Sequence, residues 1–321
     1  MGASISRSSS ASSSAGRSRR AHSPTPPGGT RLFPIFHVGR KRSRSEVKAA
    51  VKSPTKERGR AYTSETSDEP IVRQHYVLEA VIGSGYVSPI EHPRRILDIG
   101  AHSLMWMLDL AKEFHRSQIT GIGLRPLRAD TSLPVNCSFE IVDLYDDPRL
   151  PFPNAYFDFV RHRILNVPVR PENQQAYISE CARVTAPSGW VELAQWQGFC
   201  EYAGPAAARW HEWFLRAMET RIADTYYIDQ VEELMRTAGL EEVQRKEYLI
   251  PVGAWAGSAG QLSWTNIEDG TILIAEELAR VHGVPKQMIC ELLPQMQQEV
   301  SEHRGCFSFV VYFGRKPDIS Y

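Results

Sequence analysis

Short apolar runs alternate with segments of helical spacing along the middle of the chain. Five runs, at 95–99, 118–123, 138–142, 156–160 and 189–194, have the length of buried strands, and helical patterns occupy about 103–116 and 172–185. Strands joined through helices need crossover connections, which are right-handed and leave helices on both faces of a mostly parallel sheet. The alternation therefore predicts an α/β fold.

The last third of the chain adds two strands and several helices. Apolar patterns at 242–250 and 306–313 predict strands, and those near 205–222, 228–238, 260–282 and 285–303 predict helices. A further helix at 71–82 should end at Gly83 and Gly85. We expect one domain over 70–321, with a core at 70–196 and a helical lid with closing strands at 197–321.

The first 69 residues differ from the rest in composition. Residues 1–70 hold 14 Lys/Arg and 5 Asp/Glu, a net charge of +9. The remainder carries a net charge of −9, because the whole chain has 37 Lys/Arg and 37 Asp/Glu and is neutral overall. Serine-rich runs with few apolar residues predict a disordered basic tail. The acidic body argues against nucleic acid as a specific partner, because phosphate binding needs basic surface.

The tail carries two targeting patterns. Met1-Gly2-Ala-Ser-Ile-Ser6 fits the myristoylation pattern, so Gly2 is a candidate lipidation site. The basic run at 40–44 would add attraction to an anionic membrane surface, or act as a nuclear localisation signal. No secretory h-region or membrane span is apparent. We expect an intracellular, cytoplasmic protein, with membrane tethering or the nucleus as alternatives.

Five cysteines are scattered along the chain without a C-x-x-C pair. This spacing predicts reduced thiols rather than disulfides or a zinc site, and we expect no metal.

Acidic residues and glycines follow the predicted strands. Ile96-Leu-Asp98-Ile-Gly100 ends the first strand just before a helix, and Asp143 ends the third. In open α/β sheets ligands bind at the carboxyl ends of strands, where a glycine allows close approach and a helix offers free N–H groups. The segments 150–160 and 182–193 then lead into the fourth and fifth strands.

Taken in order, these segments resemble the successive motifs of class I S-adenosylmethionine-dependent methyltransferases. Arg73-Gln-His-Tyr-Val-Leu, Pro251-Val-Gly-Ala-Trp-Ala-Gly257 and Phe309-Val-Val-Tyr-Phe-Gly-Arg-Lys-Pro317 resemble the fungal LaeA-like methyltransferases in particular, over roughly 70–317. The resemblance implies a Rossmann-like fold with a seven-stranded sheet, S-adenosyl-L-methionine as cofactor, and a small-molecule substrate, with fungal secondary metabolism as its setting. It implies these cofactor-binding residues: Asp98, Gly100, Ala101, His102, Ser103, Gly123, Asp143, Leu144 and Arg161.

The glycine loop departs from the family pattern Asp-x-Gly-x-Gly-x-Gly. His102 and Leu104 stand at its second and third glycines, and Gly123 stands where the family has an acid for the ribose. His102 could fill the cofactor pocket, turn aside from it, or take part in catalysis. The alternative to an enzyme is therefore a pseudomethyltransferase that serves as a binding or scaffolding module with a protein partner.

Histidines and aromatic residues complete the set of candidates. His162, predicted to follow the fourth strand, and His75 are candidate general bases, because the pKa of histidine lies near working pH. Tyr76, Trp190 and Trp255 are candidate substrate contacts. Simple packing is the alternative for each of these side chains.

Overall fold

The computed structural model describes residues 69–101, 103–124, 126–144, 147–163, 169, 171–199, 203–219 and 230–318. Within these ranges one sheet of seven strands has the order β3-β2-β1-β4-β5-β7-β6. Strands β1 (Arg95–Ile99), β2 (Gln118–Gly123), β3 (Cys137–Ile141), β4 (Phe157–Arg163) and β5 (Thr185–Phe199) pair in parallel. Strand β7 (Cys306–Arg315) is antiparallel to both β5 and β6 (Glu241–Pro251). The mostly parallel seven-stranded sheet is confirmed.

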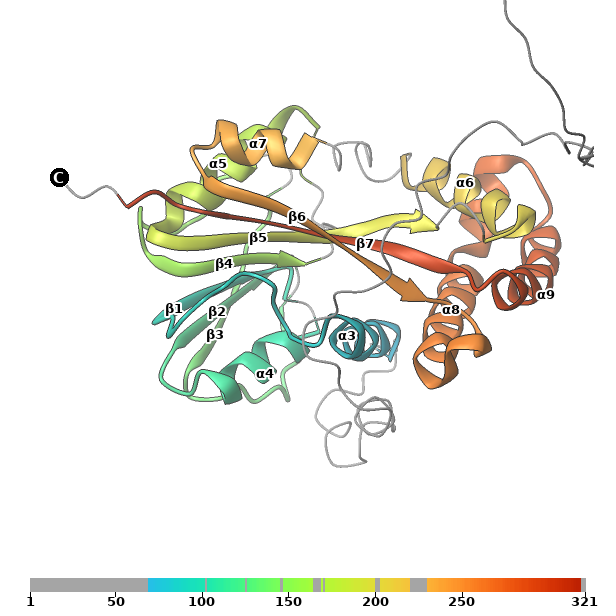
Figure 1. Cartoon of the computed structure of the whole chain (residues 1–321), viewed down its shortest axis with the longest axis horizontal. Coiled ribbons are helices and arrows are strands. Elements are labelled where there is room, and N and C mark those ends of the chain that lie inside the picture. Colours follow the sequence, from blue (N-terminus) through green and yellow to red (C-terminus); the bar gives the residue numbers. More distant parts are fainter. Residues whose placement is uncertain are drawn as a thin grey trace, which may run out of the picture. The chain divides into compact units, whose positions relative to one another are not determined.

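Helices cover both faces of this sheet (Figure 1). Helices α3 (Glu69–Ile82) and α4 (Met105–Glu113) lie on one face, and α5 (Gln174–Val184) and α7 (Val231–Thr237) lie on the other. Side chains alternate along each strand, so each strand contributes to two apolar clusters. On β1, for example, Ile96 packs with α4, whereas Leu97 and Ile99 pack with α5.

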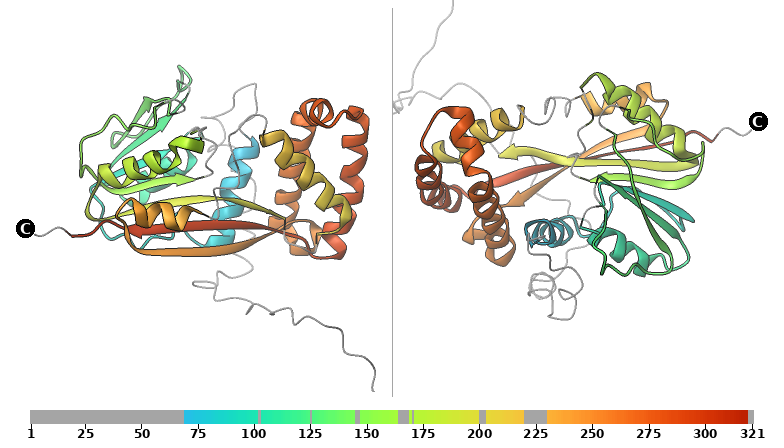
Figure 2. Two further views of the ribbon diagram at one scale, coloured as in Figure 1. Left: turned by 90° about the horizontal axis from the view of Figure 1, so that it is seen from above. Right: turned by 180° about the vertical axis from the view of Figure 1, so that it is seen from behind.

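The remaining helices pack around the far ends of the long strands. Helices α6 (Pro205–Glu219), α8 (Gly257–His282) and α9 (Lys286–Glu302) lie beyond the ends of β5, β6 and β7, as Figure 2 shows. The short 3-10 turns η1 (Pro171–Asn173) and η3 (Ala254–Ala256) precede α5 and α8. Trp210, Trp264 and Met296 lie in the apolar cluster that joins these helices.

Three predicted boundaries were wrong in ways that matter for the site. Strand β4 continues to Arg163, so Arg161, His162 and Arg163 belong to the strand instead of following it. Strand β5 runs from Thr185 to Phe199, well beyond the predicted 189–194, because its second half pairs with β7. Helix α4 begins at Met105 instead of 103, because Leu104 has left-handed backbone. Helix α3 ends as predicted, where Gly83 has a φ of 83°.

All described residues fall in the compact unit that runs from Val38 to Tyr321. The predicted tail up to residue 68, Gly2 included, and His102 lie outside the described residues, whereas Glu69 begins α3.

Candidate functional site

The loop between β1 and α4 holds the first group of predicted site residues. Gly100 has a φ of 84°, and the backbone N–H groups of Gly100 and Ala101 both donate to the carbonyl of Ile122 on β2. Gly121 permits this, because a Cβ on it would come within 2.9 Å of the Ala101 Cβ. The loop therefore lies directly on the carboxyl end of β2, with Ser103 half-buried beside it.

Leu104 keeps the backbone conformation that a glycine would adopt most easily. Its φ of 55° and ψ of −10° are left-handed, a region that costs an ordinary residue about 1–2 kcal/mol. Its side chain is 3% exposed and packs in the apolar cluster under α4, with Ile96 and Met107. The leucine is thus held in the core, and its side chain belongs to the protein interior.

Three charged side chains cross the sheet side by side on the face of α3 and α4. The register pairs Asp98 on β1 with Arg161 on β4, and Arg161 with Glu192 on β5. Arg161 Nε donates to Glu192 Oε1 at 3.0 Å, and all three side chains are buried. Burial raises the pKa of Asp98 to about 6, although the nearby guanidinium groups oppose the rise.

Glu192 also fastens the connection between α3 and β1. Its Oε2 accepts from the backbone N–H of Val87 at 2.7 Å, and from the N–H and Oγ–H of Ser88 at 2.8 and 2.9 Å. Trp106 Nε1 donates to the carbonyl of Gly85 at 2.6 Å in the same connection. The Arg161 guanidinium carbon lies 4.1 Å from the centroid of the Trp106 ring. These contacts anchor the connection to the sheet beside the loop that follows β1.

His75 joins α3 to α4 and to the end of β4. Its Nε2 lies 3.0 Å from Asp109 Oδ2, and its Nδ1 lies 3.1 Å from Arg163 Nη1. Burial lowers the pKa of His75 to about 4, so the ring is neutral near pH 7. A guanidinium can only donate, so Nδ1 accepts and the ring proton is on Nε2, which donates to Asp109. Tyr76, next in the helix, is half-buried and meets the His75 ring edge-on.

His162 lies on the opposite face of the sheet from Arg161 and Arg163. It is fully buried, and its Nδ1 lies 2.6 Å from the Tyr177 Oη of α5. Adjacent residues of a strand point to opposite faces, so β4 sends its two arginines toward α3 and α4 and this histidine toward α5. The structure thus does not bring His162 and His75 together, and a role for His162 as a base stays a prediction.

The ends of β2 and β3 lie next to each other. The carbonyl of Gly123 accepts from the backbone N–H of Val142 at 3.0 Å, which places Asp143 just beyond the end of β2. Asp143 is exposed, whereas Leu144 is 1% exposed and packs in the cluster under α5. No carboxylate stands at Gly123 itself, so the ribose partner expected from the family is replaced by bare backbone.

The two candidate tryptophans lie in different parts of the structure. Trp190 packs under α4, with its ring centroid 5.9 Å from that of Phe313. Trp255 lies in η3, is 38% exposed, and donates from Nε1 to the Val252 carbonyl at 2.7 Å. Neither is among the partners of Asp98 or Arg161, so contact with a substrate stays a prediction for both.

Sequence reasoning missed Glu192, Arg163, Asp109 and Trp106 as parts of this site. Glu192 had a usable signal, because it interrupts a strand whose other residues are apolar, and a buried carboxylate needs a partner. The contacts of Asp109 and Arg163 depend on the packing of α3, which no local pattern reveals.

The ligand-type atoms of His75, Glu79 and Asp109 all lie within 4.8 Å of one another. Lys112 binds Asp109 Oδ1 at 3.0 Å and Arg163 binds His75, so positive charge already balances this group. We therefore assign no metal to it.

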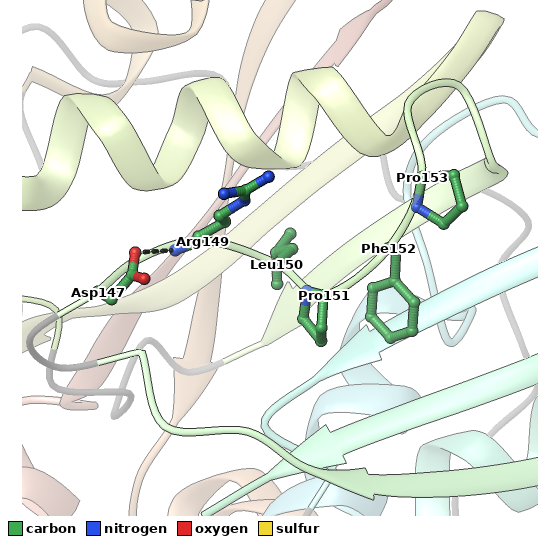
Figure 3. A pocket seen from close by; sticks show the side chains of 6 residues that line it. All are labelled: Asp147, Arg149, Leu150, Pro151, Phe152 and Pro153. Atoms are coloured by element: carbon green, nitrogen blue, oxygen red, sulfur yellow. Dashed lines mark hydrogen bonds between the residues drawn. The ribbon is translucent and has the colours of Figure 1, made fainter.

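A hollow of about 560 Å³ lies along the segment before β4 (Figure 3). It is lined by Asp147, Arg149, Leu150, Pro151, Phe152 and Pro153, and the Leu150 N–H donates to Glu180 of α5. None of the residues of the β1–α4 loop lines it.

Within the described ranges, no helix is long and apolar enough to span a membrane.

No family profile matches the chain. The N-methyltransferase sirN of Leptosphaeria maculans is 24% identical over 267 residues, which cover 79% of this chain and 93% of that protein. The N-methyltransferase gliN of Aspergillus fumigatus is 21% identical over 264 residues, 76% of this chain and 91% of that protein. The secondary metabolism regulator laeA of Coprinopsis cinerea is 25% identical over 177 residues, 50% of this chain and 42% of that protein.

Among solved structures, phosphoethanolamine N-methyltransferase 2 of Haemonchus contortus is 15% identical, with a TM-score of 0.47. The match covers 83% of this chain and 61% of that one. The strand order and the sequence relatives agree: the chain has the class I methyltransferase fold and resembles the fungal N-methyltransferases and LaeA-type regulators.

Proposed function

We propose that this chain is an S-adenosylmethionine-dependent methyltransferase that acts on a small molecule. One observation carries the proposal: Asp98 and the left-handed Gly100 stand at the point where the strand order reverses, between β1 and β4. Ligands of open α/β sheets bind in the crevice outside the carboxyl ends of the strands at this switch point. The similarity to fungal N-methyltransferases supports the same activity.

The residues present fit the methionine end of this cofactor better than its ribose end. Gly100 lets a ligand approach the backbone, and the side chain of Leu104 is packed under α4. Buried Asp98 is suited to accept from an ammonium group, and exposed Asp143 is suited to accept from an adenine amine. Gly123 offers the ribose only backbone. When bound, S-adenosylmethionine would supply an electrophilic methyl group, and the protein would mainly position it against the acceptor.

Calorimetric titration with S-adenosylhomocysteine tests cofactor binding directly. We expect saturable binding that Asp98→Asn weakens about ten- to a hundredfold, because a charge-assisted hydrogen bond is lost. Asp130→Asn makes the same chemical change in an exposed acid that pairs with Arg128, and it should leave binding unchanged. Absence of heat at millimolar ligand in the unmodified protein would refute the proposal.

The second candidate is a pseudomethyltransferase that serves as a binding or scaffolding module. The missing acid at Gly123 favours it, because a hydrogen bond to a carboxylate is ordinarily worth about 1.5–3 kcal/mol. On this account the unmodified protein does not bind S-adenosylhomocysteine, and Gly123→Asp creates or strengthens binding. Micromolar binding by the unmodified protein would exclude the second candidate.

A further inference from the structure

The end of β4 places two guanidinium groups on one face of the sheet. Arg161 and Arg163 are two residues apart in the strand, so their side chains lie on the same face, toward α3. Asp98 lies on this face as well, opposite Arg161 in the register. Arg163 is half-buried, whereas Arg161 is 3% exposed.

Within the described part of the chain, this arrangement leaves one guanidinium nitrogen without a hydrogen-bond partner. The Nη1 of Arg161 is buried and has no hydrogen-bond partner among the described residues. Burial and the nearby Arg161 lower the pKa of Arg163 to about 9, against the opposing effect of Asp98, Glu192 and Glu79. An anion at the carboxyl end of β4 would satisfy both guanidinium groups.

Arg163 is also held in place by a chain of contacts. Lys112 donates to Asp109 Oδ1 at 3.0 Å, and Asp109 Oδ2 accepts from His75 Nε2 at 3.0 Å. This fixes the proton of the neutral ring on Nε2, so that Nδ1 faces Arg163 Nη1 at 3.1 Å as an acceptor. One side of the guanidinium is thus occupied by His75, and its other donors remain for a ligand.

We propose that Arg163 binds the carboxylate of the methionine part of S-adenosylmethionine, and that His75 and Asp109 are its positioning residues. This inference rests on the proposed function. The planar fork of a guanidinium matches a carboxylate with two parallel hydrogen bonds. Asp98 lies opposite Arg161 in the register, and the β1–α4 loop follows it at the carboxyl end of β1, next to β4. A cofactor bound at this loop would have its amino-acid end within reach of β4.

The test compares two ligands that differ only in this carboxylate. S-adenosylhomocysteine and its decarboxylated analogue are titrated calorimetrically into the full chain and into Arg163→Met. We expect the variant to weaken S-adenosylhomocysteine by about ten- to a hundredfold and to change the decarboxylated analogue less than about twofold. Arg95→Met, which removes an exposed arginine at the other end of β1, should change neither.

Two substitutions of His75 separate positioning from folding. His75→Asn keeps an acceptor near the place of Nδ1, facing Arg163, and His75→Gln keeps a donor near the place of Nε2, facing Asp109. The preference for the carboxylated ligand should survive in His75→Asn and fall in His75→Gln. Asp109→Asn should lower it as well, because its single amide oxygen cannot accept from both Lys112 and the ring, and its NH₂ group would face the other donor. Thermal midpoints of all variants identify any that do not fold, and Arg163→Gln then replaces Arg163→Met.

The outcomes distinguish this inference from the proposed function. Binding of neither ligand by the unmodified protein would overturn both. If Arg163→Met weakens both ligands equally, or neither, the carboxylate assignment is overturned while cofactor binding stands. If His75→Asn and His75→Gln behave alike, the positioning role is overturned.

Discussion

Substitution of Glu192 by glutamine should destabilise the protein by about 3–5 kcal/mol, which is the usual cost of removing one partner of a buried ion pair. The Glu192 side chain is fully buried, and its two oxygens accept four hydrogen bonds, three from Val87 and Ser88 and one from Arg161. Glutamine has one acceptor oxygen, and its amide would face donors. Arg161 would in addition lose its counter-charge in the interior.

Urea unfolding followed by tryptophan fluorescence measures this loss, with circular dichroism as a second probe of two-state behaviour. Glu232→Gln is the matched control, because Glu232 pairs with Arg236 one helical turn away at the surface. That change should cost about 0.5 kcal/mol or less. A loss below about 1 kcal/mol for Glu192→Gln would refute the reasoning. A cycle with Arg161→Met should show a coupling of about 1.5 kcal/mol or more.

Variants at three further positions test other parts of the site. Burial holds the pKa of His75 at about 4 in the fold against 6.5 in the unfolded chain, so this residue costs stability as pH falls from about 6.5 to 4. Asp98 acts in the opposite direction. Its pKa is about 6 in the folded protein and 3.8 in the unfolded chain, so the folded protein binds the proton at higher pH and gains stability on acidification. Between pH 7 and 4 the unmodified protein should therefore gain about 2.5 kcal/mol of stability from this group, and Asp98→Asn should lack that gain. Urea unfolding at each pH measures the difference, and the same pH profile in both proteins would contradict the assignment. Leu104→Ala keeps the left-handed strain and loses packing, whereas Leu104→Gly loses packing and relieves about 1 kcal/mol of strain. The glycine variant should thus unfold at higher urea than the alanine variant, and the reverse order would show that strain is absent. Tyr177→Phe removes the hydroxyl that meets His162 and should cost about 1–3 kcal/mol without changing the affinity for S-adenosylhomocysteine, since both residues lie on the face of α5. A change in that affinity would place His162 at the ligand.

The sequence predicted most strands because periodicity and length are local properties. The ranges 95–99 and 118–123 were placed correctly, since apolar runs there are bounded by polar or glycine residues. The predicted end of β4 was wrong because the polar residues Arg161, His162 and Arg163 are typical of a loop. Only their partners on other elements allow such residues to lie in a buried strand. The predicted strand at 189–194 was shorter than β5, because the second half of β5 pairs with β7, and this pairing joins segments more than a hundred residues apart.

Positions of the candidate site were more predictable than its contacts. Motif order placed Asp98, Gly100 and Asp143 at the carboxyl ends of strands of one parallel sheet, and the structure has them at the ends of β1 and β3, on either side of β2. The partly buried network between Arg163, His75 and Asp109 depends on how α3 crosses β4 and α4. A helix pattern states which residues share a face, and it cannot state which distant side chains that face will meet.

Leu104 has a consequence for how this chain can change over generations. Replacement of Leu104 by the glycine of the methyltransferase loop pattern would open a hole beneath α4, since the leucine is 3% exposed in that core. Such holes cost about 2–5 kcal/mol, more than the strain that the glycine would relieve. Position 104 therefore accepts a glycine at little cost only together with larger side chains at neighbours such as Ile96 and Met107.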